Sequence, residues 1–285
     1  MICKEIIEII EKQSPKSYAC DWDNVGLLIG SHEKDVKRIY IALDADDKAI
    51  QEAVAAGADM LLTHHPMIFK GMKKINSDDF IGRRVIELIK NDMAYYAMHT
   101  NFDISQMADL AAERMGLLEQ KPLQVTGTAV LDVDVEKQEN AEHTAHAGGA
   151  YEIGIGKIGK LPEKETVSAF AERVKKAFEV DSVKVFVNPM DDSFMEKEIQ
   201  KIAICPGSGK SVIKDALKAG AQVFVTGDID HHEGIDAAAC GMIILDAGHY
   251  GVEKLFVPYM EQYLKGVLPE IEIIAAKPRQ PFIYV

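Results

Sequence analysis

The sequence predicts an α/β protein with parallel or mixed sheets, made of two domains that an internal strand-helix-strand repeat relates to each other. Three observations support this fold class. Short apolar runs alternate with amphipathic helical segments, which is the pattern of strand-helix-strand units. Residues 38–63 align without a gap with residues 201–226, and both copies end in Ala-Gly-Ala, a strand and a threonine. Apolar residues make up 47% of the chain, which is enough for a full globular core.

Residues 1–116 are predicted to form a helix followed by alternating strands and helices. Isoleucine pairs recur between charges at helical spacing in the first segment, and Gly57 and Gly116 stand where helices end. The only tryptophan, Trp22, is interpreted as a core residue rather than a stacking platform. We expect, in order, helix 2–12, strand 25–29, strand 39–43, helix 48–56, strand 60–65, helix 78–91, strand 93–98 and helix 105–115.

The character of the sequence changes near residue 125. We interpret 125–235 as a second α/β domain, and 1–124 together with 236–285 as the metal-binding domain. Residues 136–146, which include His143 and His146, are polar and are expected to form an exposed loop or hairpin tip. The other expected elements are strand 125–135, strand 151–156, helix 164–178, strand 182–187, strand 242–246, helix 253–265 and closing strands 271–275 and 281–285.

Composition limits the partners that the protein can have. The formal charge of −13 argues against binding to a nucleic-acid backbone or to an anionic membrane. The four cysteines form no C-x-x-C pair and no signal peptide is evident, so we expect a cytoplasmic protein with reduced thiols. No apolar run approaches the ~20 residues of a membrane span.

Two adjacent histidines stand at the end of a predicted buried strand. His64 and His65 come at its carboxyl end, where open α/β sheets place their ligand sites. Successive strand residues point to opposite faces, so both imidazoles can serve one site only if the backbone turns at Pro66. Taken alone, the pair is equally well explained as a polar strand end.

Further metal-ligand side chains follow two other strands. Asp103 comes after the strand at 93–98, and His249 and Glu253 lie four residues apart at a helix start, so that they share one face. Each has an ordinary alternative: a cap for Asp103, a turn residue for His249, and an acid favoured by the helix dipole for Glu253. The hypothesis of a metal site rests on their convergence with the two histidines.

The predicted ligands suit a pair of divalent ions. Imidazole and carboxylate groups bind Zn, Mn, Fe or Ni, and the lack of thiolates at these strand ends disfavours a structural zinc site. Three histidines and two carboxylates exceed the needs of one tetrahedral ion, whereas two ions about 3.5–4 Å apart would use the full set. We therefore predict a dinuclear site held by His64, His65, Asp103, His249 and Glu253.

Two glycine-rich motifs depart from nucleotide-binding patterns. Residues 154–159 match G-x-G-x-x-G, but Pro162 and a charged stretch precede the next helix, which favours a tight turn. Residues 206–211 end like a phosphate-binding loop, yet Ile204 stands where the first glycine of that motif belongs. A small-residue turn is the simpler interpretation, although its amides could bind an anionic group of a substrate.

Five segments, in order along nearly the whole chain, form a recognisable set: Trp22-Asp23-Asn24-Val25-Gly26-Leu27, Leu62-Thr63-His64-His65-Pro66, His99-Thr100-Asn101-Phe102-Asp103, Thr226-Gly227-Asp228 with His231-His232, and Gly248-His249-Tyr250 with Glu253. In these segments the chain resembles the Nif-three-like family, whose bacterial members are named as homologues of a type-two GTP cyclohydrolase one. The resemblance implies two intertwined α/β domains, a dinuclear metal site and a ring-shaped homohexamer. It also implies that the metal ligands are the five residues proposed above. Residues 125–200 are too few for the extra domain that some relatives carry, so the chain resembles the compact form.

The leading hypothesis for function is a metal-dependent hydrolase that uses a metal-bound hydroxide. If the family name holds, the substrate is a small molecule such as GTP, whose purine ring is opened by water. His99 and His232 are the candidate catalytic residues for proton transfer, and one of His231 and His232 is expected to line the cleft. The alternative is a non-catalytic metal-binding scaffold or regulatory protein that acts through protein partners.

Overall fold

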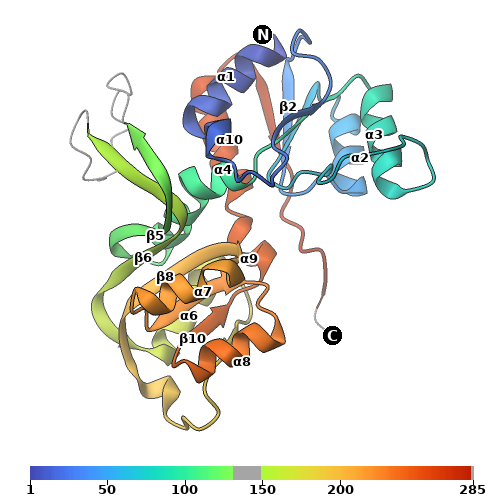
Figure 1. The fold of residues 1–285 in the computed structure, drawn as a ribbon. Helices are drawn as coiled ribbons and strands as arrows, with labels where there is room; N and C mark the ends of the chain where they lie inside the picture. Colours follow the sequence, from blue (N-terminus) through green and yellow to red (C-terminus); the bar gives the residue numbers. More distant parts are fainter. Residues whose placement is uncertain (131–148, 284–285) are drawn as a thin grey trace. The chain divides into compact units, whose positions relative to one another are not determined.

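The computed structural model describes residues 1–130 and 149–283 of the chain. Within these residues the protein is mixed α/β with two mixed sheets, which confirms the predicted fold class (Figure 1). The expected loop at 136–146, with His143 and His146, lies outside the described residues.

Contacts divide the chain into two units. The first consists of Met1–Met107 with Val252–Val285, and the second is Ala108–Gly251. The second unit is wider than the segment 125–235 that the sequence suggests. The reason is that β5 (Leu118–Val130) begins before residue 125 and β10 (Ile243–Asp246) follows residue 235, and both strands pair within the second sheet.

The first unit is built on a five-stranded sheet in the order β1-β4-β3-β2-β11. Strands β11, β2, β3 and β4 are parallel, and β1 is antiparallel to β4. Every residue of β3 and β4 is buried, as expected for inner strands covered on both faces. The strands are β1 (Gly26–Ile29), β2 (Arg38–Ala42), β3 (Met60–Thr63), β4 (Ala94–Ala97) and β11 (Glu272–Ala275).

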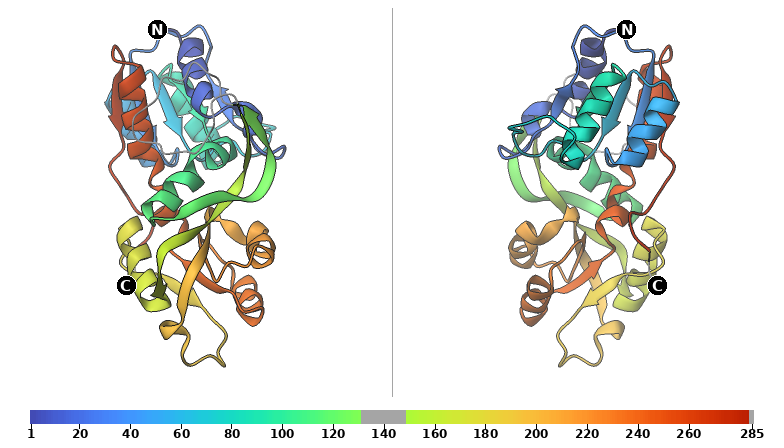
Figure 2. Two further views of the ribbon diagram at one scale, coloured as in Figure 1. Left: turned by 90° about the vertical axis from the view of Figure 1, so that its left-hand side faces the viewer. Right: turned by 90° about the vertical axis from the view of Figure 1, so that its right-hand side faces the viewer.

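Helices cover both faces of this sheet (Figures 1 and 2). Ile50 of α2 and Leu88 of α3 join Leu61 of β3 in the core of one face. On the other face, the Tyr96 hydroxyl of β4 donates a hydrogen bond to Glu11 of α1 at 2.9 Å. The helices are α1 (Cys3–Gln13), α2 (Asp47–Ala55), α3 (Phe80–Lys90), the short α4 (Thr100–Phe102) and α10 (Phe256–Val267).

The second unit has a six-stranded sheet in the order β5-β6-β8-β9-β10-β7, in which β8, β9 and β10 are parallel. Its strands are β5 (Leu118–Val130), β6 (Ala150–Thr166), β7 (Lys184–Phe186), β8 (Glu198–Ser208), β9 (Val223–Gly227) and β10 (Ile243–Asp246). Ala216 of α7 and Ala237 of α8 join Phe224 in one core, while α5 and α6 pack against β6. The helices are α5 (Ala108–Arg114), α6 (Val167–Phe178), α7 (Ile213–Lys218) and α8 (His231–Ala239), and α9 (His249–Glu253) leads into the first unit.

The internal repeat extends beyond the residues that align in sequence. Strands β1-β4-β3-β2 and β7-β10-β9-β8 have the same order, and in each set an antiparallel strand flanks three parallel ones. The register agrees as well, since Thr63 pairs with Ala97 and Thr226 pairs with Asp246. Each unit therefore contains the same half-structure, with polar residues at the carboxyl ends of its parallel strands.

Four local predictions are wrong. Trp22 is 61% exposed and is not a core residue. The predicted helix 105–115 is wrong only at its start, because residues 105–107 belong to a π turn at Asp103–Met107 that continues from α4, and α5 begins at Ala108. The motif at 154–159 lies within β6 and is not a tight turn, and the described residues 281–283 are not in a strand.

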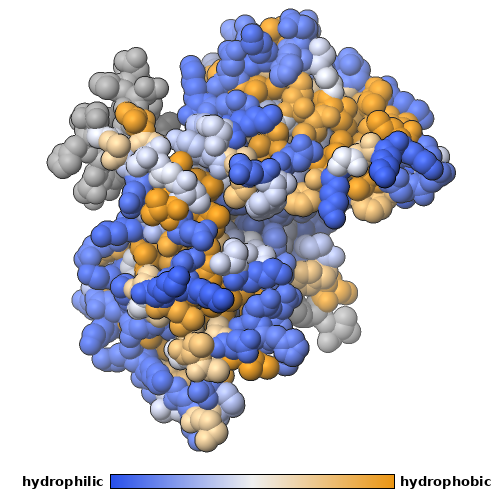
Figure 3. Space-filling view, in the orientation of Figure 1, coloured by the Kyte–Doolittle hydropathy of each residue, from blue (hydrophilic) through white to orange (hydrophobic). Residues whose placement is uncertain are grey.

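Polar residues cover most of the visible surface, and apolar residues lie between them (Figure 3). In the part of the chain that the structure describes, no helix has the length and apolar character needed to cross a membrane. Two of the exposed apolar side chains, Trp22 and Phe69, contact each other through their rings.

Candidate metal centre

Strand β3 delivers two histidines to its carboxyl end. His64 is fully buried and His65 partly so, and their ring centroids lie 4.8 Å apart. The hydroxyl of Thr63 donates to the carbonyl of His65 at 2.9 Å, which fixes the turn after the strand. Tyr95 of β4 holds the same turn, because its hydroxyl donates to that carbonyl at 3.1 Å and accepts from the Met67 amide at 2.8 Å. Polar groups of two inner strands thus bring both imidazoles together.

Two carboxylates reach these histidines from other elements of the first unit. Asp103 begins the π turn, a type of irregularity often found at functional sites. Its Oδ1 lies 3.5 Å from Nε2 of His64. Glu253 is buried at the end of α9, and its Oε2 lies 2.9 Å from Nε2 of His65 and 3.7 Å from Nε2 of His64. Two imidazoles and two carboxylates therefore form one cluster.

The atoms of this cluster fit a divalent metal ion. Within the described residues, neither ring nitrogen of His64 makes a hydrogen bond, and neither does the buried Oδ1 of Asp103. A buried polar group without a hydrogen-bond partner lowers the stability of the fold by about 1–3 kcal/mol. Coordination to a cation would offset this cost. The ligand atoms of His64, Asp103 and Glu253 lie within 4.8 Å of one another, so these groups could bind a metal ion.

Carboxylates also orient two of the histidines, through the ring nitrogen Nδ1. Asp44 follows β2 and its Oδ1 lies 2.8 Å from Nδ1 of His65, while Oδ1 of Asp23 lies 2.9 Å from Nδ1 of His99. Burial would raise the pKa of Asp23, but hydrogen bonds from His99 and Thr100 outweigh it and lower the pKa to about 2. Histidines that bind metals commonly donate their second ring N–H to a carboxylate in this way.

These two aspartates were missed as functional residues in the sequence. Asp44 stands directly after a predicted strand that neighbours the Thr-His-His strand, and Asp23 belongs to the Trp-Asp-Asn segment. The sequence identifies Asp44 as a residue at a polar strand end and Asp23 as a residue of a polar turn. Their roles depend on which ring each carboxylate meets, and that is decided by strand order rather than by local pattern.

The charges in the cluster are strongly coupled. Burial would lower the pKa of His65, but hydrogen bonds and negative charge from Asp44 and Glu253 raise it to about 10. Burial raises the pKa of the Asp103 carboxyl; His64 opposes this effect and the charge of Glu253 adds to it. A cation in the cluster would favour the opposite states, namely neutral imidazole and ionised carboxylate.

His99 completes the group of imidazoles. Its ring centroid lies 5.4 Å from that of His64 and 5.6 Å from that of His65, and the three rings place ligand atoms within 4.8 Å of one another. Asp23 engages Nδ1, so Nε2 is the nitrogen left for a metal ion or for proton transfer.

The other predicted site residues belong to the second unit. His249 opens α9 four residues before Glu253, and its Nδ1 lies 2.9 Å from Oδ2 of Asp228. It is thus oriented by a carboxylate, like the histidines of the first unit. His231 and His232 open α8, where both are exposed and their ring centroids lie 5.3 Å apart. Coordination by His249 and proton transfer by His232 stay predictions.

The glycine-rich turn at 206–211 forms the end of β8 and a single helical turn. The Gly209 amide donates to Thr226 Oγ1 at 3.0 Å, and that hydroxyl donates to the carbonyl of Gly207 at 3.1 Å. The Gly209 amide is therefore engaged within the protein. This arrangement agrees with the small-residue turn predicted in place of a phosphate-binding loop.

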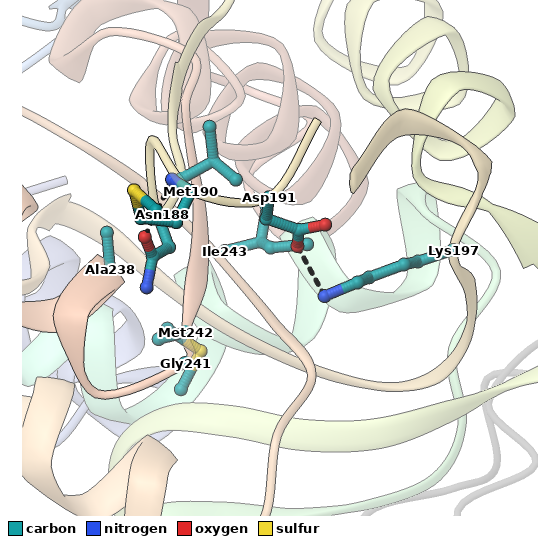
Figure 4. Close-up of a pocket in the computed structure, with 9 residues that line it drawn as sticks. Asn188, Met190, Asp191, Lys197, Ala238, Gly241, Met242 and Ile243 are labelled. Atoms are coloured by element: carbon teal, nitrogen blue, oxygen red, sulfur yellow. Dashed lines mark hydrogen bonds and ion pairs between the residues drawn. The ribbon is translucent and has the colours of Figure 1, made fainter. Parts of the chain in front are cut away.

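A hollow of about 290 Å³ lies in the second unit between the loop after β7 and the end of α8 (Figure 4). Asn188, Met190 and the ion pair of Asp191 with Lys197 line one part of it. Gly241 and Ile243 line another, at the amino end of β10. Because parallel sheets place their sites at carboxyl ends, this hollow is not the candidate centre.

The fold and the cluster together define a class of protein: two-sheet α/β proteins in which imidazoles and carboxylates at strand ends could hold a metal ion. The Duf34/NIF3 (NGG1p interacting factor 3) family matches residues 1–281, and the chain belongs to that family. The resemblance noted in the sequence is thereby confirmed.

Relatives match over most of their length. The chain is 34% identical over 259 residues to the GTP cyclohydrolase 1 type 2 homolog of Streptococcus pneumoniae, covering 90% of this chain and 88% of that protein. The homolog of the same name from Clostridium perfringens is 31% identical, with 100% of both chains covered. A solved structure of a Bacillus cereus protein related to NIF3 has a TM-score of 0.85 at 27% identity, covering 100% and 99% of the chains. Reduced HcgD from Methanocaldococcus jannaschii has a TM-score of 0.76 at 31% identity, covering 96% and 97%.

Proposed function

We propose that this protein is a hydrolase of a small molecule that depends on two divalent metal ions. One observation carries the proposal: His64 is a fully buried imidazole that makes no hydrogen bond with any residue of 1–130 or 149–283, and it stands between carboxylates. Asp103 and Glu253 lie 3.5 and 3.7 Å from its Nε2. Burying such groups together is costly unless a ligand satisfies them.

The proposed ligands are His64, His65, Asp103, His249 and Glu253, and the proposed ions are Zn, Fe, Mn or Ni. The position of Glu253 suits a carboxylate shared by a pair of ions, because its Oε2 lies 2.9 Å from Nε2 of His65 and 3.7 Å from Nε2 of His64. His249 precedes Glu253 by one helical turn on α9, so both side chains project from the same face of that helix.

The protein's own residues would position the reactants and move protons. When bound, two divalent ions lower the pKa of water and polarise the group under attack. Asp23 holds His99 through Nδ1, so that its Nε2 can take a proton from water and return it to a leaving group. His232, at the start of α8, is the second proposed proton carrier.

The name of the bacterial relatives suggests a nucleotide such as GTP as the substrate and hydrolytic ring opening as the reaction. From the family resemblance we also propose a ring-shaped homohexamer. Light scattering on the purified protein should then give the mass of six chains of 31.5 kDa each.

Elemental analysis of the untagged protein tests the metal site. We expect about two equivalents of metal per chain, and their loss in a His65→Ala/Glu253→Gln double variant. His32→Ala is the matched control, because His32 is exposed and lies outside the cluster, and it should keep the full metal content. Wild-type protein that binds no divalent ion would overturn the proposal.

Turnover separates hydrolysis from metal binding alone. The metal-loaded protein is assayed on nucleotides, phosphoesters and cyclic amides, with His64→Ala beside it. Hydrolysis by the wild type that the variant lacks supports the proposal. Full metal content with no turnover on any of these classes would instead favour the metal-binding scaffold.

A further inference from the structure

Two large aromatic side chains stand exposed next to the candidate centre. Trp22 is 61% exposed and Phe69 is 45% exposed, and their ring centroids lie 5.8 Å apart. Large aromatic side chains are usually mostly buried, and an exposed cluster of them often marks a binding site. Neither residue takes part in the proposed chemistry.

The aromatic pair adjoins the imidazoles within the first unit. The ring centroid of His99 lies 6.0 Å from that of Trp22 and 6.4 Å from that of Phe69. The same ring lies 5.4 Å from His64. His99 therefore lies next to both the exposed aromatic pair and His64 of the cluster.

Hydrogen bonds fix the loops that carry these rings. Asp23, next to Trp22, accepts from the amide and the hydroxyl of Thr100 at 3.0 and 2.6 Å. Asn24 donates through Nδ2 to the carbonyl of Ile68 at 2.5 Å, which ties the Trp22 loop to the residue before Phe69. The two rings are thus held in place without being buried, which lowers the entropic cost of binding a ligand.

A positively charged segment follows Phe69 directly. Lys70, Lys73 and Lys74 are all exposed, and among the described residues none of them pairs with a carboxylate. Such a run stands out in a chain with a formal charge of −13. Lysine side chains free of carboxylate partners favour an anionic group on a ligand.

We propose that Trp22 and Phe69 stack on a planar aromatic ring of the substrate, with Lys70, Lys73 and Lys74 attracting its anionic group. This inference rests on the proposed function, because it names the residues that present the substrate to His99 and the metal ligands. A nucleotide has both required parts: a flat base for the two rings and a phosphate for the lysines.

The single tryptophan makes the stacking directly measurable. Trp22 is the only indole in the chain, so its emission reports on its own surroundings. The purified full-length protein is titrated with GMP, with guanosine and with ribose 5-phosphate. We expect GMP and guanosine to quench the emission and GMP to bind more tightly, whereas ribose 5-phosphate should leave it unchanged. Unchanged emission with both ring-containing probes would overturn the inference.

Variants assign the two parts of the recognition. By calorimetry, Trp22→Leu and Phe69→Leu should each weaken GMP binding about tenfold, the size expected for loss of one stacking ring. Changing all three lysines to glutamine should weaken the binding of GMP but not that of guanosine. Phe80→Leu is the matched control, since Phe80 is 51% exposed on α3 and contacts Arg84 instead. Equal effects of Phe80→Leu and Trp22→Leu would overturn the inference.

These readouts are independent of turnover and of metal content. If GMP quenches Trp22 in protein that binds no metal, the ring-binding role stands and the proposed hydrolase fails. If metal binds and GMP neither binds nor quenches, the hydrolase stands and the ring-binding role fails.

Discussion

The two units share one strand arrangement but carry different side chains where its parallel strands end. In the first unit, Thr63 is followed by two histidines; in the second, Thr226 is followed by Gly227 and Asp228. The threonines nevertheless play the same part, since each hydroxyl donates to a backbone carbonyl of a strand-end turn. The half-structure is therefore maintained by its strands and threonines, and the two copies differ in the residues that follow.

Gly227 shows why the second copy has no histidine at this position. It aligns with His64, and a Cβ on it would lie 2.5 Å from the amide nitrogen of His249 and 2.6 Å from its Cα. A side chain does not fit there without displacing the backbone. The next residue, Asp228, contacts the ring of His249 instead. The first copy thus places one buried and one partly buried imidazole after its threonine. The second copy has no room for a side chain there, and its Asp228 orients His249 instead.

Replacing His64 with leucine should have the largest effect, because it makes the strand end of the first copy apolar. Metal content should fall to background. At an ion concentration about 1,000 times Kd, binding stabilises the wild type by about 4 kcal/mol, and the variant should gain none of this. After chelation the variant should be the more stable of the two proteins by about 1–3 kcal/mol. Leucine replaces a buried imidazole that has no hydrogen-bond partner in the described part of the chain. Urea unfolding with and without chelator measures both, and a chelated variant weaker than the chelated wild type would contradict the account.

Neutralising the orienting carboxylates should come next. Asp44→Asn should lower metal affinity about 10- to 100-fold. The ionised carboxylate of Asp44 accepts from Nδ1 of His65 and so fixes the ring, and the neutral amide would do this less well. Asp228→Asn should do the same through His249 if that residue is a ligand. Competition with a coloured chelator measures both affinities. Asp230→Asn serves as the control, since Asp230 pairs with Lys210 on the surface. A normal affinity in Asp228→Asn would confine the ligands to the first copy.

Acid should weaken the first unit through Asp23. Its pKa of about 2 in the folded protein lies below the ordinary value of 3.8, so its ionised form adds stability above about pH 4. That contribution, about 2 kcal/mol, is lost as the pH falls through 2. The difference in unfolding free energy between the wild type and Asp23→Asn should therefore shrink as the pH falls from about 5 toward 2. A difference independent of pH would show that the ionised carboxylate is not what stabilises the loop.

The paired threonines give the smallest and most closely matched test. Thr226→Val leaves the buried Gly209 amide without its acceptor and should cost about 2 kcal/mol. Thr63→Val should cost about 1 kcal/mol less, because the Tyr95 hydroxyl still donates to the carbonyl of His65. Thermal unfolding of the two variants in chelator measures the difference. The opposite order would mean that the first turn depends on its threonine more than the contacts indicate.

The fold class could be predicted because apolar periodicity is local and recurs in both copies. The two adjacent histidines were visible for the same reason, as polar residues directly after a buried strand. The exposure of Trp22 and the strand at residues 154–159 could not be predicted, because both depend on tertiary packing. Trp22 is exposed because its loop is tied down by neighbouring hydrogen bonds rather than by burial of the indole. The glycines at 154–159 suit close strand pairing, since a Cβ on Gly154 would lie 2.0 Å from the carbonyl oxygen of Gln124.

The first unit is discontinuous, and this has a consequence for synthesis on the ribosome. Strand β2 must wait for its parallel neighbour β11, which is made about 230 residues later. At typical elongation rates that delay is on the order of 10–50 s. Glu253 also arrives only after the second unit has been translated. The second unit, a single continuous segment, can fold while that edge of β2 is still unpaired, so the proposed ligand Glu253 can join His64 and His65 only after the second unit has been made.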